Sequence, residues 1–168
     1  RPRRRPAART ARLLLARVER GGRILLARSP EGGLFPGMWG LPAVEVDADG
    51  RGGVEGGSPA GVLERGARRE LGLRLRVGEE VASLTRVLTH RILELHVHRA
   101  ELREGGRLDP ARLRFTTEGD ASRLPASTAM RRVIEASGGW RSGSRGTRDT
   151  KNVSGESRKA LTSRGRTV

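Results

Sequence analysis

The sequence predicts an α+β domain in which a mixed sheet is packed by helices, and three observations predict it. Apolar and polar residues alternate over 93–98, which is the period of a strand with one buried face. A glycine pair, Gly21-Gly22, separates two apolar runs, as in a β-hairpin. The segment 59–71 has capping residues at both ends and apolar residues at the i+4 spacing of a helix. These elements are expected to share one core over residues 12–137.

The N-terminal part is expected to form three strands and a long loop. Two strands, at 13–18 and 23–27, are joined by the glycine pair. The segment 29–42 holds four glycines and three prolines, so we expect an extended loop there. Trp39 lies among apolar neighbours in this loop and is expected to anchor it to the core rather than to stack on a base. A short strand is expected at 44–46.

The helix over 59–71 has clear signals at both ends. Ser58 is a good N-cap, Pro59 suits the first helical position, and Gly72 stands where a left-handed C-terminal cap belongs. Apolar residues follow at i+4 spacing between these ends. We therefore predict a helix with one buried face.

The C-terminal part is expected to add two strands and a last helix. The strands lie at 81–88 and 93–97, a loop or short helix occupies 109–120, and an amphipathic helix spans 126–136. The predicted order is therefore β-β-β-α-β-β-α.

The net charge of +15 is concentrated at the two ends of the chain. Residues 1–17 carry +7, residues 138–168 carry +6, and residues 18–137 carry +2. Such ends attract any polyanion without reading its sequence, so the charge supports nucleic-acid contact only weakly. We expect 1–11 to be a basic leader or interdomain linker and 138–168 to be a disordered basic tail.

Composition excludes several kinds of site. The chain has no cysteine, which excludes disulfides, cysteine-ligated zinc and an iron–sulfur cluster held by this chain. The apolar run at 13–18 is too short for a signal peptide or a membrane span. A soluble, intracellular monomer with no membrane contact is therefore expected.

The hairpin, the loop ending in Trp39-Gly40-Leu41-Pro42 and the helix ending in Arg68-Arg69-Glu70-Leu71-Gly72-Leu73 together resemble the Nudix fold. In hydrolases of that family the helix follows G-x5-E-x7-R-E-U-x-E-E-x-G-U, where U is a bulky aliphatic residue. The resemblance implies that the glutamates hold a divalent metal against a diphosphate, because Mg²⁺ needs several oxygen ligands.

The chain can be aligned with this pattern in two registers. If Arg69-Glu70-Leu71 is the R-E-U element, the paired glutamates fall on Leu73 and Arg74. If Glu70 begins the E-x-G-U ending, the other glutamates fall on Arg69, Gly66 and Gly57. Glu70 alone is kept in either register. We therefore expect no metal site and no catalytic residue, with Glu70 in an ion pair on the helix surface.

Three segments in order, 37–42, 88–97 and 124–130, resemble the C-terminal Nudix-like domain of bacterial A/G-specific adenine DNA glycosylase, the MutY type. The resemblance implies recognition of 8-oxoguanine opposite adenine in double-stranded DNA, with Leu88, Thr89 and His90 as the lesion-binding residues. Hydroxyl and imidazole groups suit the reading of a base edge. Leu88 stands where that family has an aromatic residue, so it can wedge but not stack.

The same resemblance implies a non-catalytic DNA-binding part of a larger base-excision repair enzyme, or a fragment of one. Its partner would be an N-terminal helix-hairpin-helix glycosylase domain, which usually carries the iron–sulfur cluster, so no cofactor is expected in this chain. The implied location is cytoplasmic and nucleoid-associated.

Two other functions stay open: a divergent Nudix hydrolase releasing pyrophosphate from oxidised nucleoside triphosphates with Mg²⁺, and an inactive remnant. His96 and His98 share one strand face, but with one nearby acid and no cysteine they are expected to be solvated rather than metal ligands.

Overall fold

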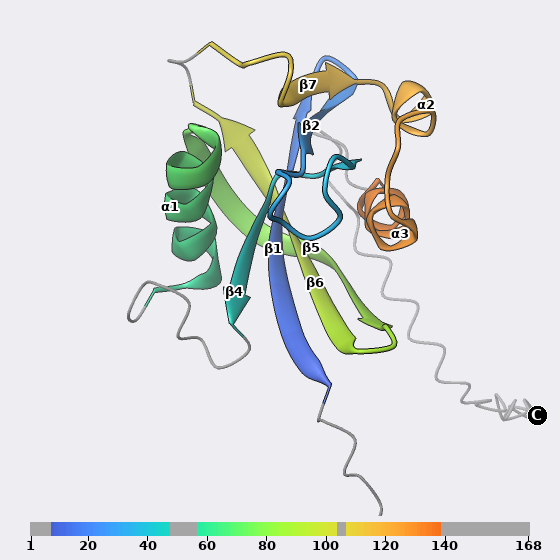
Figure 1. Ribbon diagram of the computed structural model, residues 1–168. Coiled ribbons are helices and arrows are strands. Elements are labelled where there is room, and N and C mark those ends of the chain that lie inside the picture. The colour runs from blue at the N-terminus through green and yellow to red at the C-terminus, as the bar shows by residue number, and fades with distance from the viewer. Residues whose placement is uncertain (1–7, 48–56, 104–106, 139–168) are drawn as a thin grey trace, which may run out of the picture.

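The computed structural model describes residues 8–47, 57–103 and 107–138, and these form a mixed sheet with helices on both faces (Figure 1). The predicted α+β class is confirmed. The elements, in chain order, are β1 (Arg9–Arg20), β2 (Arg23–Arg28), β3 (Trp39–Gly40), β4 (Ala43–Asp47), α1 (Pro59–Leu71), β5 (Leu75–Val87), β6 (Arg91–Leu102), β7 (Leu113–Thr116), α2 (Glu118–Ala121) and α3 (Thr128–Ser137).

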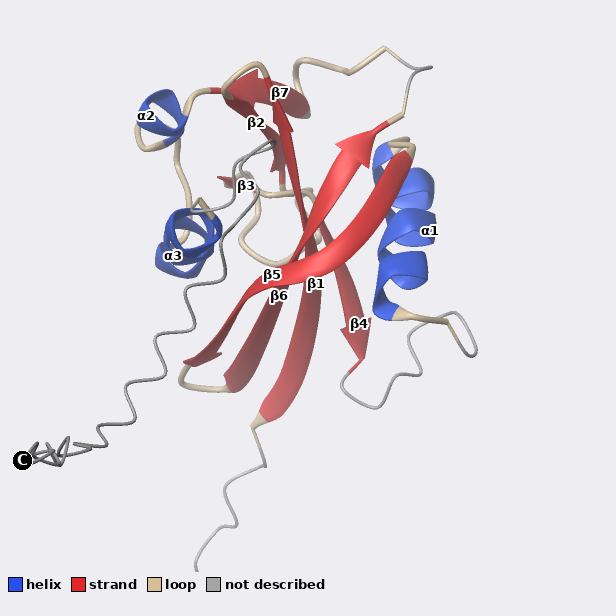
Figure 2. Cartoon of the chain, turned by 180° about the vertical axis from the view of Figure 1, so that it is seen from behind, coloured by secondary structure: helices blue, strands red, loops and turns tan. Residues whose placement is uncertain are grey.

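Strand β1 is the centre of the sheet. The hydrogen-bonded order is β3-β2-β1-β6-β5, with β4 paired to β1 and β7 paired to β2. The first half of β1 lies between antiparallel β4 and parallel β6, and its last residues form the antiparallel hairpin with β2. Figure 2 shows β5 and β6 as long neighbouring strands between α1 and α3. Strand β4 therefore forms one edge, beside α1.

The sheet buries a core on each face. Leu13 and Leu15 belong to the core under α3, while Leu14 and Ala16 belong to the core under α1. This division follows from the period of two along a strand. Because β1 is covered on both faces, its apolar residues run continuously instead of alternating.

Helix α1 has the expected ends. The Ser58 hydroxyl accepts a hydrogen bond from the Gly61 N–H at 3.2 Å. Gly72 adopts φ 65°, and its N–H donates to the carbonyls of Ala67 and Arg68, which closes the helix. The predicted bounds 59–71 are confirmed, since both caps act locally and depend on no distant contact.

The C-terminal half contains more structure than expected. Strand β5 begins at Leu75, and β7 and α2 occupy the segment expected to be a loop or short helix. Strand β7 has four residues and pairs with β2. So short a strand shows too little alternation to be recognised, and its pairing with a distant segment defines it.

The basic leader is partly a strand. Strand β1 begins at Arg9, inside the segment 1–11, and it continues through Arg17, whose side chain is fully buried. Residues 1–7 and 139–168, to which most of the leader and the expected disordered tail belong, lie outside the described residues. In the described ranges no helix is long and apolar enough to cross a membrane.

Candidate functional site

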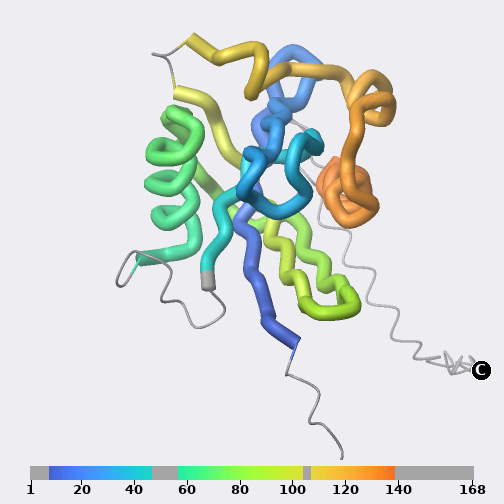
Figure 3. The backbone as a smooth tube through the Cα atoms, viewed as in Figure 1, coloured from blue at the N-terminus to red at the C-terminus, as the bar shows by residue number. Residues whose placement is uncertain are grey.

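A pocket lies between the loop 29–42, the start of β4 and the end of α1. Figure 3 shows this loop folded across the sheet between α1 and α3. The pocket has a volume of about 160 Å³ and mainly apolar walls. Its lining includes Leu13, Leu34, Phe35, Met38, Trp39, Leu41, Leu71 and Met130, with Arg28, Glu45 and Glu70 as charged members. Apolar walls with a few polar groups are typical of small-molecule sites.

The loop is held by its own backbone. The Ser29 N–H donates to the Met38 carbonyl at 2.8 Å, and the Gly37 N–H donates to the Ser29 carbonyl at 3.0 Å. The Ser29 hydroxyl donates to the Leu34 carbonyl at 2.6 Å. Ser29 therefore closes the loop on itself, so the pocket wall is formed before a ligand arrives.

Phe35 has an unusual backbone conformation within this loop. Its φ is 56°, and it is the sole non-glycine residue with a positive φ among the described residues. A bulky side chain in the left-handed region costs on the order of 1–2 kcal/mol. Such strain persists where the surrounding structure holds it, and functional sites are a frequent place for it. Phe35 is therefore held at the pocket at a cost in stability.

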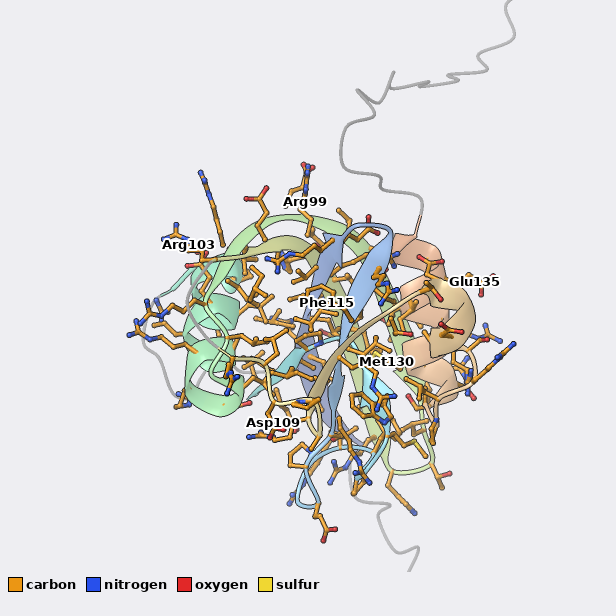
Figure 4. All side chains as sticks on the ribbon, turned by 90° about the horizontal axis from the view of Figure 1, so that it is seen from above. Arg99, Arg103, Asp109, Phe115, Met130 and Glu135 are labelled. Atoms are coloured by element: carbon orange, nitrogen blue, oxygen red, sulfur yellow. The ribbon has the colours of Figure 1, made fainter. Side chains whose placement is uncertain are left out.

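Helix α3 supplies the opposite wall through Met130. Figure 4 shows Met130 on the side of α3 that faces the strands. The Leu41 N–H donates to the Met130 sulfur at 3.3 Å. A Cβ added to Gly40 would lie 2.6 Å from the Met130 Cγ and Cε. The Met130 side chain therefore occupies space that is open because residue 40 is a glycine. Trp39 is half-buried against the same core, and the Arg114 guanidinium lies 5.0 Å from its ring centroid.

Charged side chains from β2, β4 and α1 line the pocket, and two further arginines contact Glu70 beside it. The Arg69 guanidinium lies 3.2 Å from a Glu70 carboxylate oxygen, as expected for a surface ion pair. Arg112 donates to the Glu70 carbonyl at 3.1 Å. Arg28 donates through Nε to the Gly37 carbonyl at 3.3 Å. Glu45 of β4 is exposed and lines the same pocket.

The structure decides between the two registers of the family pattern. Gly72 is the left-handed cap of α1 and Leu73 is buried directly after it. This is the behaviour of the G-U ending, since a glycine suits the cap and an aliphatic residue suits the core. The second register therefore holds, and the pattern glutamates fall on Glu70, Arg69, Gly66 and Gly57.

These residues do not fit the divalent metal of the family pattern. A Cβ at Gly66 would lie 2.6 Å from both Cγ atoms of Val44, so this position has no room for a carboxylate side chain. Glu64, the other acid of α1, accepts the Val77 N–H at 2.9 Å. In the part of the chain that the structure describes, no three His, Cys, Asp or Glu residues lie together. Mg²⁺ takes several oxygen ligands, and this helix offers one at the pocket.

Leu88, Thr89 and His90 lie together in the turn between β5 and β6. All three are exposed, and the turn is closed by the Leu88 N–H donating to the Arg91 carbonyl at 2.7 Å. None of them lines the pocket at the loop 29–42. Their expected role in ligand contact stays a prediction that no contact in the structure tests.

The two strand histidines differ from each other. His96 is half-buried, and its Nδ1 lies 2.5 Å from a Glu80 carboxylate oxygen. His98 is buried, and its Nδ1 lies 3.1 Å from the Gly78 carbonyl, so the expectation of a solvated residue is wrong there. The register shift between β5 and β6 near residue 80 brings these partners close, which the sequence did not indicate.

Sequence reasoning missed the pocket itself. Arg28, Glu45 and Met130 come from β2, β4 and α3, and their meeting depends on strand pairing and on the placement of α3. The cluster of glycines and prolines around Phe35 was the available signal, because long ordered loops often carry function.

Two solved structures illustrate the likeness of the fold to known proteins. The solution structure of the E. coli ORF135 protein matches with a TM-score of 0.60 and 28% identity, covering 77% of this chain and 89% of that one. A Nudix hydrolase from Nitrosomonas europaea matches with a TM-score of 0.56 and 16% identity, covering 74% and 68%. The second likeness shows the fold alone.

A curated relative is the CTP pyrophosphohydrolase of Escherichia coli (strain K12). It is 37% identical over 84 residues, which are 50% of this chain and 57% of the relative. The match thus spans somewhat more than half of the relative's length.

The glycosylase interpretation is wrong. The relatives described above include a CTP pyrophosphohydrolase and a Nudix hydrolase, and none of them ties the chain to an adenine DNA glycosylase. The expected repair role, the 8-oxoguanine:adenine duplex and the helix-hairpin-helix partner domain lose their basis with it.

A family model described as the NUDIX domain matches residues 13–136, which spans the elements from β1 to α3. The hairpin, the loop, the capped helix and the second register of the helix pattern agree with that match. The chain belongs to the Nudix domain family.

Proposed function

We propose that this chain is a divergent Nudix hydrolase that acts on nucleoside triphosphates, with the base held in the loop pocket. The observation that carries the proposal is the position of the pocket: it opens at the end of α1, where Glu70, the remaining glutamate of the family pattern, lines it. The likeness to a CTP pyrophosphohydrolase supports the same substrate class.

The pocket has the chemistry to hold one ring of a base. Phe35 and Trp39 offer aromatic surface, and Ser29 and Ser127 lie among the polar lining residues. A volume of about 160 Å³ is below the usual range of about 300–1,000 Å³ for ligand pockets. A single pyrimidine ring fits such a space better than a whole nucleotide, so the sugar and phosphates would lie outside, at the mouth. CTP is therefore the first nucleotide to test.

The reaction proposed is the hydrolysis of a nucleoside triphosphate to a monophosphate and pyrophosphate. Glu45 and Glu70 are the carboxylates lining the pocket, and a carboxylate at this position can accept a proton from water as a general base. Phe35 and Trp39 would position the base. Because the carboxylate set does not fit the family's metal, we expect turnover to be slow compared with a hydrolase that has the full set.

The test measures binding and turnover separately. In a Trp140→Phe background Trp39 is the single tryptophan, so its fluorescence reports on the pocket. We expect CTP to change this fluorescence saturably and to release pyrophosphate slowly. Phe35→Ala should weaken CTP binding, while His90→Ala, in the exposed β5–β6 turn, should leave binding unchanged.

Absence of both binding and pyrophosphate release with the common nucleoside triphosphates would overturn the proposed function. Saturable binding without pyrophosphate release would overturn its hydrolytic part and leave a nucleotide-binding domain. Equal losses of CTP affinity in Phe35→Ala and His90→Ala would contradict the placement of the base in the loop pocket.

A further inference from the structure

Two arginine side chains contact Glu70 and a third, Arg28, lines the same pocket as Glu70; we call Arg28, Arg69 and Arg112 the mouth cluster. Arg69 lies against the Glu70 carboxylate at 3.2 Å, and Arg112 donates to the Glu70 carbonyl at 3.1 Å. The Arg28 N–H donates to the Arg112 carbonyl at 2.8 Å, which ties β2 to the segment before β7. The Arg28 side chain lines the pocket, where its Nε donates to the Gly37 carbonyl at 3.3 Å. Three distant parts of the chain therefore bring positive charge to the pocket and to Glu70 beside it.

This charge stands where the family pattern has carboxylates. In the register fixed by Gly72, Arg69 occupies the position of a glutamate next to Glu70. Arg28 lines the pocket together with Glu45 and Glu70, and the guanidinium groups of Arg69 and Arg112 contact Glu70 from outside the lining. Three guanidinium groups therefore stand against two carboxylates at and beside this pocket. A site with this balance attracts phosphate groups and repels a divalent cation.

The mouth cluster can rearrange at little cost. The side chains of Arg69 and Glu70 are 61% and 45% exposed, and an ion pair so exposed contributes about 0–1 kcal/mol. A guanidinium has five N–H donors, of which the contact of Arg112 with Glu70 uses one. Guanidinium groups bind phosphate oxygens through paired, charge-assisted hydrogen bonds.

Resting on the proposed function, we propose that the mouth cluster binds the phosphates of the nucleotide directly, so that binding needs no divalent metal. In this proposal the arginines neutralise the negative charge of the phosphates. In the family pattern a divalent metal held by glutamates has that role. The negative end of the α1 dipole lies at the same place, so phosphate binding there requires cations nearby. Arg68 and Arg69 in the last turn of α1 and Arg112 beside it meet that requirement.

The first measurement is calorimetric titration of the full chain with CTP in EDTA and again in excess Mg²⁺. We expect equal or tighter binding in EDTA, because Mg²⁺ reduces the negative charge that the arginines attract. The affinity should fall steeply as salt rises, since the mouth is exposed. Binding of CTP in Mg²⁺ but not in EDTA would overturn the inference and leave the proposed function standing.

Inorganic tripolyphosphate is the second probe, because it has the phosphates without a base. We expect it to bind in EDTA more weakly than CTP. Metal-free binding as tight as that of CTP would keep the inference and contradict the proposed base pocket. Metal-free titrations in which neither CTP nor tripolyphosphate binds would overturn the inference.

A pair of matched variants locates the phosphates. Arg69→Ala should weaken metal-free binding of both probes about tenfold or more, which is the loss of one charge-assisted pair of hydrogen bonds. Arg132→Ala removes the same charge from the exposed surface of α3 and should change binding less than twofold. Urea unfolding of both variants separates loss of binding from loss of folding. Equal weakening by the two variants would mean attraction by net charge alone and would contradict the mouth cluster.

Discussion

Gly66 of α1 lies directly against Val44 of β4, so closely that a Cβ on Gly66 would stand 2.6 Å from both Cγ atoms of the valine. Val44 is 2% exposed and β-branched, so its side chain has little freedom to move away. The helix therefore rests on the edge strand at a distance that glycine permits. The same contact leaves no room for a glutamate side chain at position 66, where the family pattern has one.

We predict that Gly66→Ala destabilises the domain by about 1–3 kcal/mol through overpacking. The sign is informative, since alanine in place of glycine in a helix normally stabilises by about 1 kcal/mol. Val44→Ala should relieve the clash, so Gly66→Ala should be neutral or stabilising in that background. Urea unfolding of the four proteins gives the coupling energy. Additive effects would mean that the helix and the strand are not in this close contact.

We predict that Arg17→Met destabilises the domain by about 1.5–3 kcal/mol, the range for hydrogen bonds to a charged group, because the Ile134 carbonyl and the Ser137 hydroxyl lose their charged donor. Arg17 is fully buried, donates to the Ile134 carbonyl at 2.7 Å and to the Ser137 hydroxyl at 2.9 Å, and pairs with Glu19 and Glu118. It ties α2 and α3 to the sheet.

Arg12→Met is the control for this prediction. Arg12 lies on the same strand, and its ion pair with Glu94 is 41% and 32% exposed. Its loss should cost less than about 1 kcal/mol. Similar losses for the two variants in urea unfolding would contradict the special role of the buried arginine.

We predict a compensating pair at the pocket wall. Gly40→Ala collides with Met130, and Met130→Ala leaves a cavity that costs about 2–5 kcal/mol. In the Met130→Ala background Gly40→Ala should recover part of the lost stability, because the new methyl group enters vacated space. Thermal unfolding of the single and double variants checks this. A double variant less stable than Met130→Ala would contradict the contact.

The same substitution tests the size of the pocket. Met130→Ala shortens a side chain that lines the pocket with Phe35, so the pocket becomes larger. We therefore expect the ratio of purine-triphosphate affinity to CTP affinity to be higher in this variant than in the unmodified chain. Competition titrations with GTP and CTP measure the ratio. An unchanged ratio would place the base away from Met130.

We predict that Thr89→Ala and His90→Ala change the free energy of unfolding by less than about 0.5 kcal/mol, as is usual for exposed positions. Neither side chain lines the pocket, so CTP binding should also stay the same. Urea unfolding and the Trp39 fluorescence titration check both. Weaker CTP binding in His90→Ala would bring the β5–β6 turn into the nucleotide site.

The sequence by itself determined the local elements. Helix α1 could be bounded from Ser58, Pro59 and Gly72, because caps act within one turn, and the β1–β2 hairpin followed from its glycine pair. The loss of pattern glutamates was also visible in the sequence, with both registers leaving Glu70 alone.

The tertiary structure decided what depends on contacts between distant segments. Strand β7 is defined by its pairing with β2. Arg17 is buried because α3 packs over this part of β1 and accepts its hydrogen bonds through Ile134 and Ser137. The choice of register needed the cap at Gly72 and the burial of Leu73. The mouth cluster comes from β2, α1 and the segment before β7, so no local pattern could reveal that Arg28, Arg69 and Arg112 lie at or beside one pocket.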